Sequence, residues 1–282
     1  MNKNFKVIAE IGCTHIGSLK RAKMLSKLAK LCGADVLKTQ KRNPKESTNK
    51  DLWDKPHPNE MYSYGKTYLE HRENVELHIE DHYKLKKYCE EIEIEYSTSV
   101  WDMTSAKEIV ELNPNFIKIP SALNMNEELF NFLINNYKGK IHISTGMLDL
   151  KERIKLYSKL QKYNDRIVIY HCTSGYPVPF NKLYLKEISK LANEWDFDNI
   201  GYSNHGLGVA MFPVALTLGA NHFEVHFIDD RLFKHTDSAA SIEPQGLSKI
   251  VRDLKAAEQA LQFKPEILDD IENIQKNKLR TD

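Results

Sequence analysis

Short apolar runs rich in β-branched residues alternate with amphipathic segments along nearly all of the 282 residues. The runs have the length of buried strands, and the segments between them repeat apolar residues with the period of a helix. Strands are expected at residues 7–12, 36–40, 93–97, 116–120, 140–144, 167–172, 200–203 and 222–227. Helices are expected at residues 18–32, 81–91, 103–113, 126–137, 149–162, 181–195, 207–218 and 245–262.

Eight strand–helix units in about 250 residues predict an α/β fold, a (β/α)8 TIM barrel that forms a single domain over residues 1–282. A doubly wound open sheet is the alternative. The sequence has neither a GxGxxG motif after the first strand nor a GxxxxGK[ST] motif, which makes that alternative weaker. In a barrel, the chemistry is expected at the C-terminal ends of the strands.

Two segments depart from the strand–helix alternation. Residues 41–78 form a long polar segment with prolines and aromatic residues, and a loop of that length is usually functional. Residues from about 265 to 282 are expected to form a polar C-terminal tail. Gly33 and Gly219 stand where a helix ends, as a left-handed cap requires. Pro213 should kink the seventh helix or mark a later start.

The charge balance excludes a bulk attraction to nucleic acid or to an anionic membrane. Lysine and arginine number 40, aspartate and glutamate 39, and the net charge is +1. The longest apolar run, residues 209–218, is too short to span a membrane, and Glu10 interrupts the N-terminal one, so no secretory signal is expected. Four cysteines show no metal-binding or disulfide spacing, which favours the cytoplasm: Cys13, Cys32, Cys89 and Cys172.

Two histidines occur at matching positions near the ends of the seventh and eighth strands. His205 and His226 can therefore converge at the mouth of the barrel. Barrel closure places the first strand beside the eighth, which makes Glu10 a third metal ligand or a base that orients water. Such a set suits a divalent metal, with Mn²⁺ expected and Mg²⁺, Co²⁺ or Zn²⁺ as alternatives. A single histidine would more often be a hydrogen-bonded structural side chain.

Lys38 and Lys118 lie within strands that a barrel buries, where an ammonium group without a partner is costly. An anionic ligand would satisfy both lysines. The alternatives are pairing with internal carboxylates and a Schiff-base lysine. Hydroxyl groups ring the same mouth and, with the lysines, predict a cradle for phosphate and carboxylate, although each alone could simply fix a loop: Ser97, Ser121, Ser144, Ser174 and Ser203.

Several motifs follow one another in a fixed order, and their combination is more specific than any one of them. They are Ile8-Ala9-Glu10-Ile11-Gly12 with His15 and Gly17, Lys38-x-Gln40, Ser63-Tyr64-Gly65-Lys66-Thr67-Tyr68 with Glu70-His71-Arg72, Ser144-Thr145-Gly146-Met147, Cys172-Thr173-Ser174-x-Tyr176-Pro177, Gly201-Tyr202-Ser203-x-His205, His226-Phe227, and Asp237 with Ser241-Ile242-Glu243-Pro244. In this combination the chain resembles the sialic acid synthase (N-acetylneuraminate synthase) family.

The resemblance implies a barrel enzyme that joins phosphoenolpyruvate to an aldose of the N-acetylmannosamine type. The products would be a sialic-acid-like 2-keto-3-deoxy ulosonic acid and inorganic phosphate. It implies that His205 and His226 hold the metal with Glu10 and that these three are the catalytic residues. It further implies that Lys38, Lys118, Ser121, Ser144, Ser174 and Ser203 bind phosphoenolpyruvate, while Gln40, Tyr176 and Asp237 face the sugar.

The sequence departs from the family pattern at several positions. The family usually has Asn, Phe, Asp, a basic residue and His where this chain has Thr14, Thr39, Asn204, Val225 and Ser238. Typical members continue into a small antifreeze-like domain that reaches across a dimer. The resemblance covers the barrel alone, so this chain is expected to lack that domain. A homodimer is expected, and a separate chain could supply the cap.

Two other functions remain open from the residues alone. One is a Schiff-base aldolase that uses Lys38 or Lys118. The other is a catalytically inactive barrel that binds a sugar or serves as a scaffold. The buried charges and paired histidines argue against the second, because a disused site has no physical reason to keep them.

Overall fold

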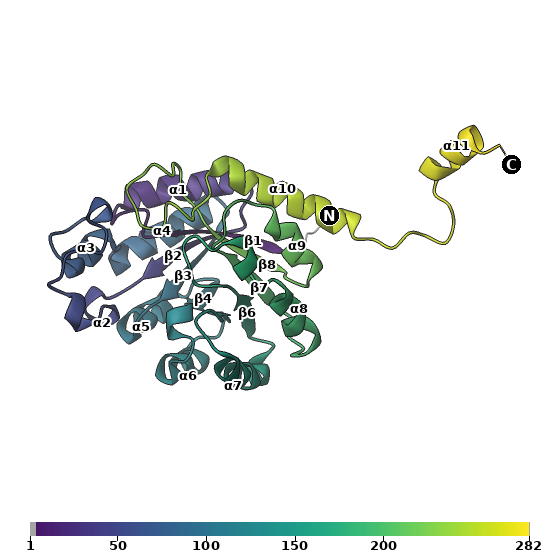
Figure 1. Cartoon of the computed structure of the whole chain (residues 1–282). Helices are drawn as coiled ribbons and strands as arrows, with labels where there is room; N and C mark the ends of the chain where they lie inside the picture. The colour runs from purple at the N-terminus through teal and green to yellow at the C-terminus, as the bar shows by residue number, and fades with distance from the viewer. Residues whose placement is uncertain (1–3, 282) are drawn as a thin grey trace.

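The computed structural model describes residues 4–281, in which eight parallel strands close into a barrel in sequence order. Helices surround the barrel, and β1 pairs with β8 to close it (Figure 1). The predicted (β/α)8 fold is therefore confirmed. The strands are β1 (Lys6–Gly12), β2 (Val36–Lys41), β3 (Glu95–Val100), β4 (Phe116–Ile119), β5 (Lys140–Ser144), β6 (Ile167–His171), β7 (Ile200–Asn204) and β8 (His222–His226).

One helix packs outside the barrel after each strand. These helices are α1 (Leu19–Leu31), α4 (Ile79–Glu91), α5 (Met103–Leu112), α6 (Glu127–Asn136), α7 (Leu150–Leu160), α8 (Lys186–Asn193), α9 (Met211–Thr217) and α10 (Pro244–Ala260). Ser18 caps α1 by accepting a hydrogen bond from the backbone of Arg21, and Asp149 forms a capping box with Glu152 at the start of α7. Gly33 and Gly219 have φ angles of 90° and 107°, which confirms that they end helices in the left-handed region.

The alternation of side chains along each strand separates two cores. In β1, Val7, Ala9 and Ile11 face outward and pack with the helices in the large apolar core. The inward residues form a smaller apolar layer within the barrel, made of Ile8, Val36, Phe116, Val168 and Tyr170. Two residues further along β1, β2 and β4, the inward side chains are Glu10, Lys38 and Lys118, so this layer lies beneath the charged C-terminal mouth.

The structure corrects several element boundaries. The third strand runs from 95 to 100 rather than from 93 to 97, because Glu93 adopts a φ of 58° in the turn after α4. The seventh predicted helix, residues 207–218, begins only at Met211, and Pro213 lies in its first turn, where proline is tolerated. The sixth, residues 181–195, begins only at Lys186, after Tyr184 with a φ of 50°.

Both segments expected to be irregular contain helices. Residues 41–78 hold α2 (Pro44–Ser47) and α3 (Tyr68–Val75). The C-terminal tail holds α11 (Asp270–Leu279), which Figure 1 shows beyond an extended connection from α10, away from the barrel. No helix within residues 4–281 is long and apolar enough to cross a membrane.

A buried histidine on α4 should make folding sensitive to acid. His82 is inaccessible to solvent, its Nδ1 lies 2.6 Å from the Tyr96 hydroxyl oxygen, and burial lowers its pKa well below the ordinary value. Below about pH 6.5 the unfolded chain binds a proton at this position and the folded chain does not. The free energy of unfolding should therefore fall as the pH decreases, by about 1 kcal/mol per pH unit from this residue.

Urea unfolding of wild type and His82→Gln at pH 6 and pH 5 measures this contribution. The variant should lose about 1 kcal/mol less than wild type over that unit of pH. His78→Gln, at an exposed position, should behave as wild type. Equal pH slopes for wild type and His82→Gln would show that His82 is not neutral in the folded protein.

Candidate active site

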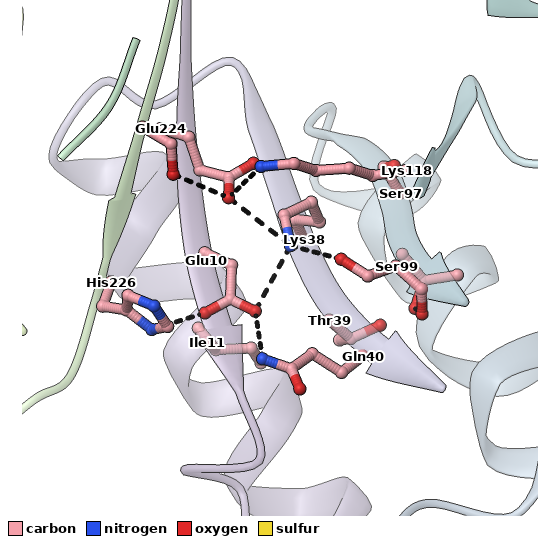
Figure 2. A network of polar contacts seen from close by, with 12 residues as sticks. Glu10, Ile11, Lys38, Thr39, Gln40, Ser97, Ser99, Lys118, Glu224 and His226 are labelled. Carbon is pink, nitrogen blue, oxygen red and sulfur yellow. Dashed lines mark hydrogen bonds and ion pairs between the residues drawn. The ribbon is translucent and has the colours of Figure 1, made fainter. Parts of the chain in front are cut away.

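A network of buried charges fills the C-terminal mouth of the barrel (Figure 2). Lys38 on β2 places its Nζ 3.3 Å from Glu10 Oε1 and 3.7 Å from Glu224 Oε1, and donates a hydrogen bond of 2.9 Å to Ser99 Oγ. Lys118 on β4 places its Nζ 2.7 Å from the same oxygen of Glu224. The order Glu10–Lys38–Glu224–Lys118 thus alternates in charge.

The two lysines have internal partners, which is one of the alternatives that the sequence left open. Each is paired with a carboxylate, and Lys118 Nζ also lies 4.4 Å from the centre of the Tyr170 ring. Sequence analysis missed Glu224 as part of the site, although it precedes His226 by two residues on β8 and so shares its inward face. Ser99 and Trp101, which line the same cavity, were missed as well.

The two carboxyl groups remain ionised in this setting. Burial by itself would raise the pKa of Glu10, but Lys38 and His226 outweigh it and hold that pKa well below the ordinary value. Burial likewise opposes ionisation of Glu224, and the two lysines lower its pKa. Burial lowers the pKa of Lys118, and the Glu224 carboxylate acts against that effect. The charges of the two lysines and the two glutamates cancel. A protonated His226 therefore leaves these five side chains with one positive charge in excess.

His205 and His226 converge as predicted. Their ring centroids are 5.6 Å apart. His205 Nδ1 lies 2.9 Å from the carbonyl oxygen of Thr173, and His226 Nδ1 lies 2.7 Å from Glu10 Oε2. Burial and the neighbouring His226 lower the pKa of His205 to about 4. Burial acts in the same direction on His226, but Glu10 prevails and raises its pKa to about 9.

The two histidines fit a divalent metal in that each has a second partner for its ring. Metal-binding histidines usually hold a carbonyl or carboxylate with one ring nitrogen and the metal with the other, and both histidines have this second partner. Neither Nε2 forms a hydrogen bond within the described residues. Across residues 4–281, however, no group of three or more His, Cys, Asp or Glu side chains is arranged to hold a metal. The oxygens of Glu10 face Lys38, Gln40 and His226, so this carboxylate positions His226.

All but two of the predicted site residues line one cavity of about 80 Å³ at the mouth. These are Glu10, Lys38, Gln40, Lys118, Ser121, Ser144, Ser174, Tyr176, Ser203, His205 and His226. Asp237 and Ser97 are the exceptions. Asp237 Oδ2 lies 3.9 Å from His226 Nδ1. Ser97 turns away, because its hydroxyl donates to the carbonyl of Phe116. A neighbouring cavity of about 380 Å³ shares Met147 and Ser174 with this one.

Gly12 lets three of these side chains approach one another. Its φ of 47° lies in the left-handed region. A Cβ atom there would lie 3.2 Å from both Gln40 Nε2 and Glu10 Oε2 and 3.3 Å from Asp237 Oδ2. Gln40 and Asp237, the residues expected to face the sugar, therefore meet over a position that only glycine fills without strain.

Removal of one partner from a buried ion pair should be costly. Glu224→Gln leaves Lys118 beside a neutral amide and should lower the free energy of unfolding by about 3 kcal/mol. The double variant Lys118→Met/Glu224→Met removes both charges and should recover most of that loss. Denaturant unfolding of the three proteins checks both values. A single variant as stable as wild type would mean that Lys118 is not charged in the folded protein.

Comparisons with known proteins agree with this geometry. A model of the NeuB family matches residues 25–265. N-acetylneuraminate-9-phosphate synthase of Homo sapiens is 34% identical over 257 residues, which cover 90% of this chain and 70% of that protein. N,N'-diacetyllegionaminic acid synthase of Legionella pneumophila is 32% identical over 260 residues, which cover 90% and 72%.

Solved structures share the fold. N-acetylneuraminic acid (sialic acid) synthetase from Leptospira borgpetersenii, in complex with citrate, superposes with a TM-score of 0.81 at 23% identity and covers 99% of this chain and 93% of its own. A truncated 3-deoxy-D-arabino-heptulosonate 7-phosphate synthase from Thermotoga maritima superposes with a TM-score of 0.66 at 14% identity, covering 91% and 87%. The chain therefore belongs to the NeuB family and is a synthase of the sialic acid type.

Proposed function

We propose that this enzyme condenses phosphoenolpyruvate with an aldose, in a reaction that depends on a divalent metal, to give a nine-carbon 2-keto-3-deoxy acid and inorganic phosphate. The observation that carries the proposal is the meeting of two buried lysines and two histidines in one cavity at the C-terminal ends of the strands. Relatives named as N-acetylneuraminate-9-phosphate, diacetyllegionaminic acid and pseudaminic acid synthases support this reaction class.

Phosphoenolpyruvate carries a phosphate and a carboxylate on a small skeleton, so a site for it needs several cations and hydroxyls close together. Lys38 and Lys118 supply the cations, and Ser121, Ser144 and Ser174 add hydroxyls in the same cavity. Glu224 holds both ammonium groups in place before the substrate enters. Ser203 Oγ lies 3.4 Å from Glu224 Oε1 and can turn toward the substrate instead.

The metal, Mn²⁺ by preference, would be held by Nε2 of His205 and of His226. When bound, it would supply a Lewis acid for the aldehyde and lower the pKa of a water molecule. Glu10 would act as a positioning residue, because its carboxylate contacts His226 Nδ1 and Lys38 Nζ at once. Metal binding at Nε2 would require the imidazolium of His226, which Glu10 stabilises, to release its Nε2 proton, while the Nδ1 proton stays toward Glu10.

The proposed reaction needs no reactant besides phosphoenolpyruvate, the aldose and water. The methylene carbon of phosphoenolpyruvate attacks the aldehyde carbon of the aldose, which forms the new carbon–carbon bond and leaves positive charge at C2. Water adds at C2, and cleavage of the C2–O bond then releases phosphate and leaves the keto acid. Lys38 and Lys118 remain beside the anion throughout and stabilise the departing phosphate electrostatically.

The aldose would lie toward Gln40, Tyr176 and Asp237. Tyr176 is half exposed, and its ring centroid lies 4.5 Å from that of His205, so it can cover one face of a sugar above the metal position. We propose an acceptor of the N-acetylmannosamine type. The assay for this acceptor varies its terminal phosphate and its N-acyl group.

We also propose that the enzyme works in the cytoplasm as a homodimer. A separate chain would supply a cap over the mouth of the barrel. The four cysteines are free thiols, which agrees with a reducing compartment. The side chain of Tyr176 is exposed at the mouth, where such a cap would contact it.

The Schiff-base alternative has less support. A lysine that attacks a carbonyl must be a neutral amine. Lys118 lies 2.7 Å from one carboxylate, and Lys38 lies within 3.7 Å of two, so each nitrogen is held in a buried ion pair that attack on a carbonyl would have to break. Borohydride reduction in the presence of pyruvate should therefore add no mass to either lysine.

A phosphate-release assay with phosphoenolpyruvate, Mn²⁺ and a panel of aldoses tests the proposal. The panel varies the 2-acetamido group and the terminal phosphate. Phosphate should appear only when both substrates are present, stop with a chelator and return with Mn²⁺. Full activity in a chelator would contradict metal dependence, and release without any aldose would contradict condensation.

His205→Ala is the matched variant for this assay. It should lower kcat at least about 1,000-fold, because it removes one of the two metal-facing imidazoles. His78→Ala removes an exposed histidine and should keep kcat within twofold. A His205→Ala enzyme with near wild-type turnover would exclude the assigned role of this residue.

A further inference from the structure

Another cavity opens at the opposite end of the barrel, where the strands begin. Its volume is about 490 Å³. Five of its lining residues are each the first residue of a strand: Lys6, Glu95, Phe116, Lys140 and His222. None of them belongs to the C-terminal mouth, and the apolar layer inside the barrel separates the two ends.

The charge of this cavity is positive. Glu95 is the one carboxylate among the described residues that line it, and it is already paired with Lys6 at 2.6 and 2.8 Å. Lys140 donates a hydrogen bond of 2.8 Å to the carbonyl oxygen of Asp165, and it forms no ion pair with a carboxylate within residues 4–281. Lys6, Lys140 and His222 all line this cavity, and burial together with the two ammonium groups lowers the pKa of His222 to about 4.

A buried imidazole without a full set of partners faces the same space. His142 is 2% exposed and stacks on Phe116 with ring centroids 3.6 Å apart. Its Nδ1 lies 2.9 Å from the Tyr170 hydroxyl oxygen, and within residues 4–281 its Nε2 forms no hydrogen bond. Its ring meets that of His222 edge to face at 5.4 Å. A ligand that accepts or donates at His142 Nε2 would complete the pairing of this buried side chain.

The cavity also has an apolar wall, made of Phe5, Phe116 and Val168. A positive rim over an apolar wall suits a molecule with an anionic group and a short carbon skeleton. We propose that this cavity is a second ligand site that binds a small organic anion. Its carboxylate or phosphate lies between Lys6, Lys140 and His222, and its carbon atoms lie against Phe116 and Val168. The proposal does not depend on the reaction at the other end of the barrel.

Histidine-ring NMR of the whole protein tests the proposal. Malonate and inorganic phosphate are titrated separately at constant ionic strength set with sodium chloride, which distinguishes carboxylate from phosphate recognition. The ring signals of His222 and His142, assigned with His222→Gln, should shift and saturate with at least one of the two anions. The signals of His205 report on the C-terminal mouth in the same spectra, so the two sites are followed separately.

Lys140→Glu is the decisive variant, because Lys140 is exposed and its replacement should leave the fold intact. The charge reversal should weaken the saturable shift of His222 at least about tenfold. Lys27→Glu makes the same change on the exposed face of α1 and should stay within twofold of wild type. Shifts that remain linear with both anions, or a Lys140→Glu titration equal to that of wild type, would overturn the proposal.

Discussion

Four buried charges of alternating sign organise the C-terminal mouth of this barrel. Each of Glu10, Lys38, Glu224 and Lys118 would be costly to bury alone, and only mutual pairing makes their burial tolerable. Barrel closure provides that pairing, because it places β1 between β2 and β8. The open sheet considered from the sequence would have no such closure.

This network is better explained by binding than by stability. Buried ion pairs can often be replaced by apolar residues without loss of stability, so their presence needs another reason. The ring of Tyr170 lies beneath Lys118, and the apolar layer around it keeps water away from the charges. In such surroundings an ammonium group attracts an anionic substrate more strongly than it would in water. The charges of these four groups cancel one another, and where no metal is bound a protonated His226 adds one positive charge.

Much of this arrangement follows from the period of the strands. Alternation along β8 places His226 on the inward face, and barrel closure brings it beside Glu10, so both could be predicted from the sequence. The pairing of Lys118 with Glu224 could not be predicted. These residues belong to β4 and β8, which lie across the barrel from each other, and their contact depends on strand tilt and side-chain length rather than on neighbouring strands.

The missed helices have a similar physical explanation. The side chains that α3 buries are His71, Arg72 and Val75, so its inner face lacks the apolar repeat by which helices are identified. Among the described residues of α11 no side chain is buried, and the capping aspartate Asp269 marks its start instead. These two helices depend on capping and on the burial of polar side chains. A search for a helical repeat of apolar residues detects neither feature.

Calorimetric titration of phosphoenolpyruvate into Lys118→Met/Glu224→Met measures how much this buried pair contributes to substrate binding. The variant exchanges one buried pair for two side chains of similar volume and leaves Lys38, Glu10 and both histidines in place. The double variant should fold and should bind phosphoenolpyruvate at least about 100-fold more weakly than wild type. An affinity within threefold of wild type would contradict the claim that these buried charges are kept to bind the substrate.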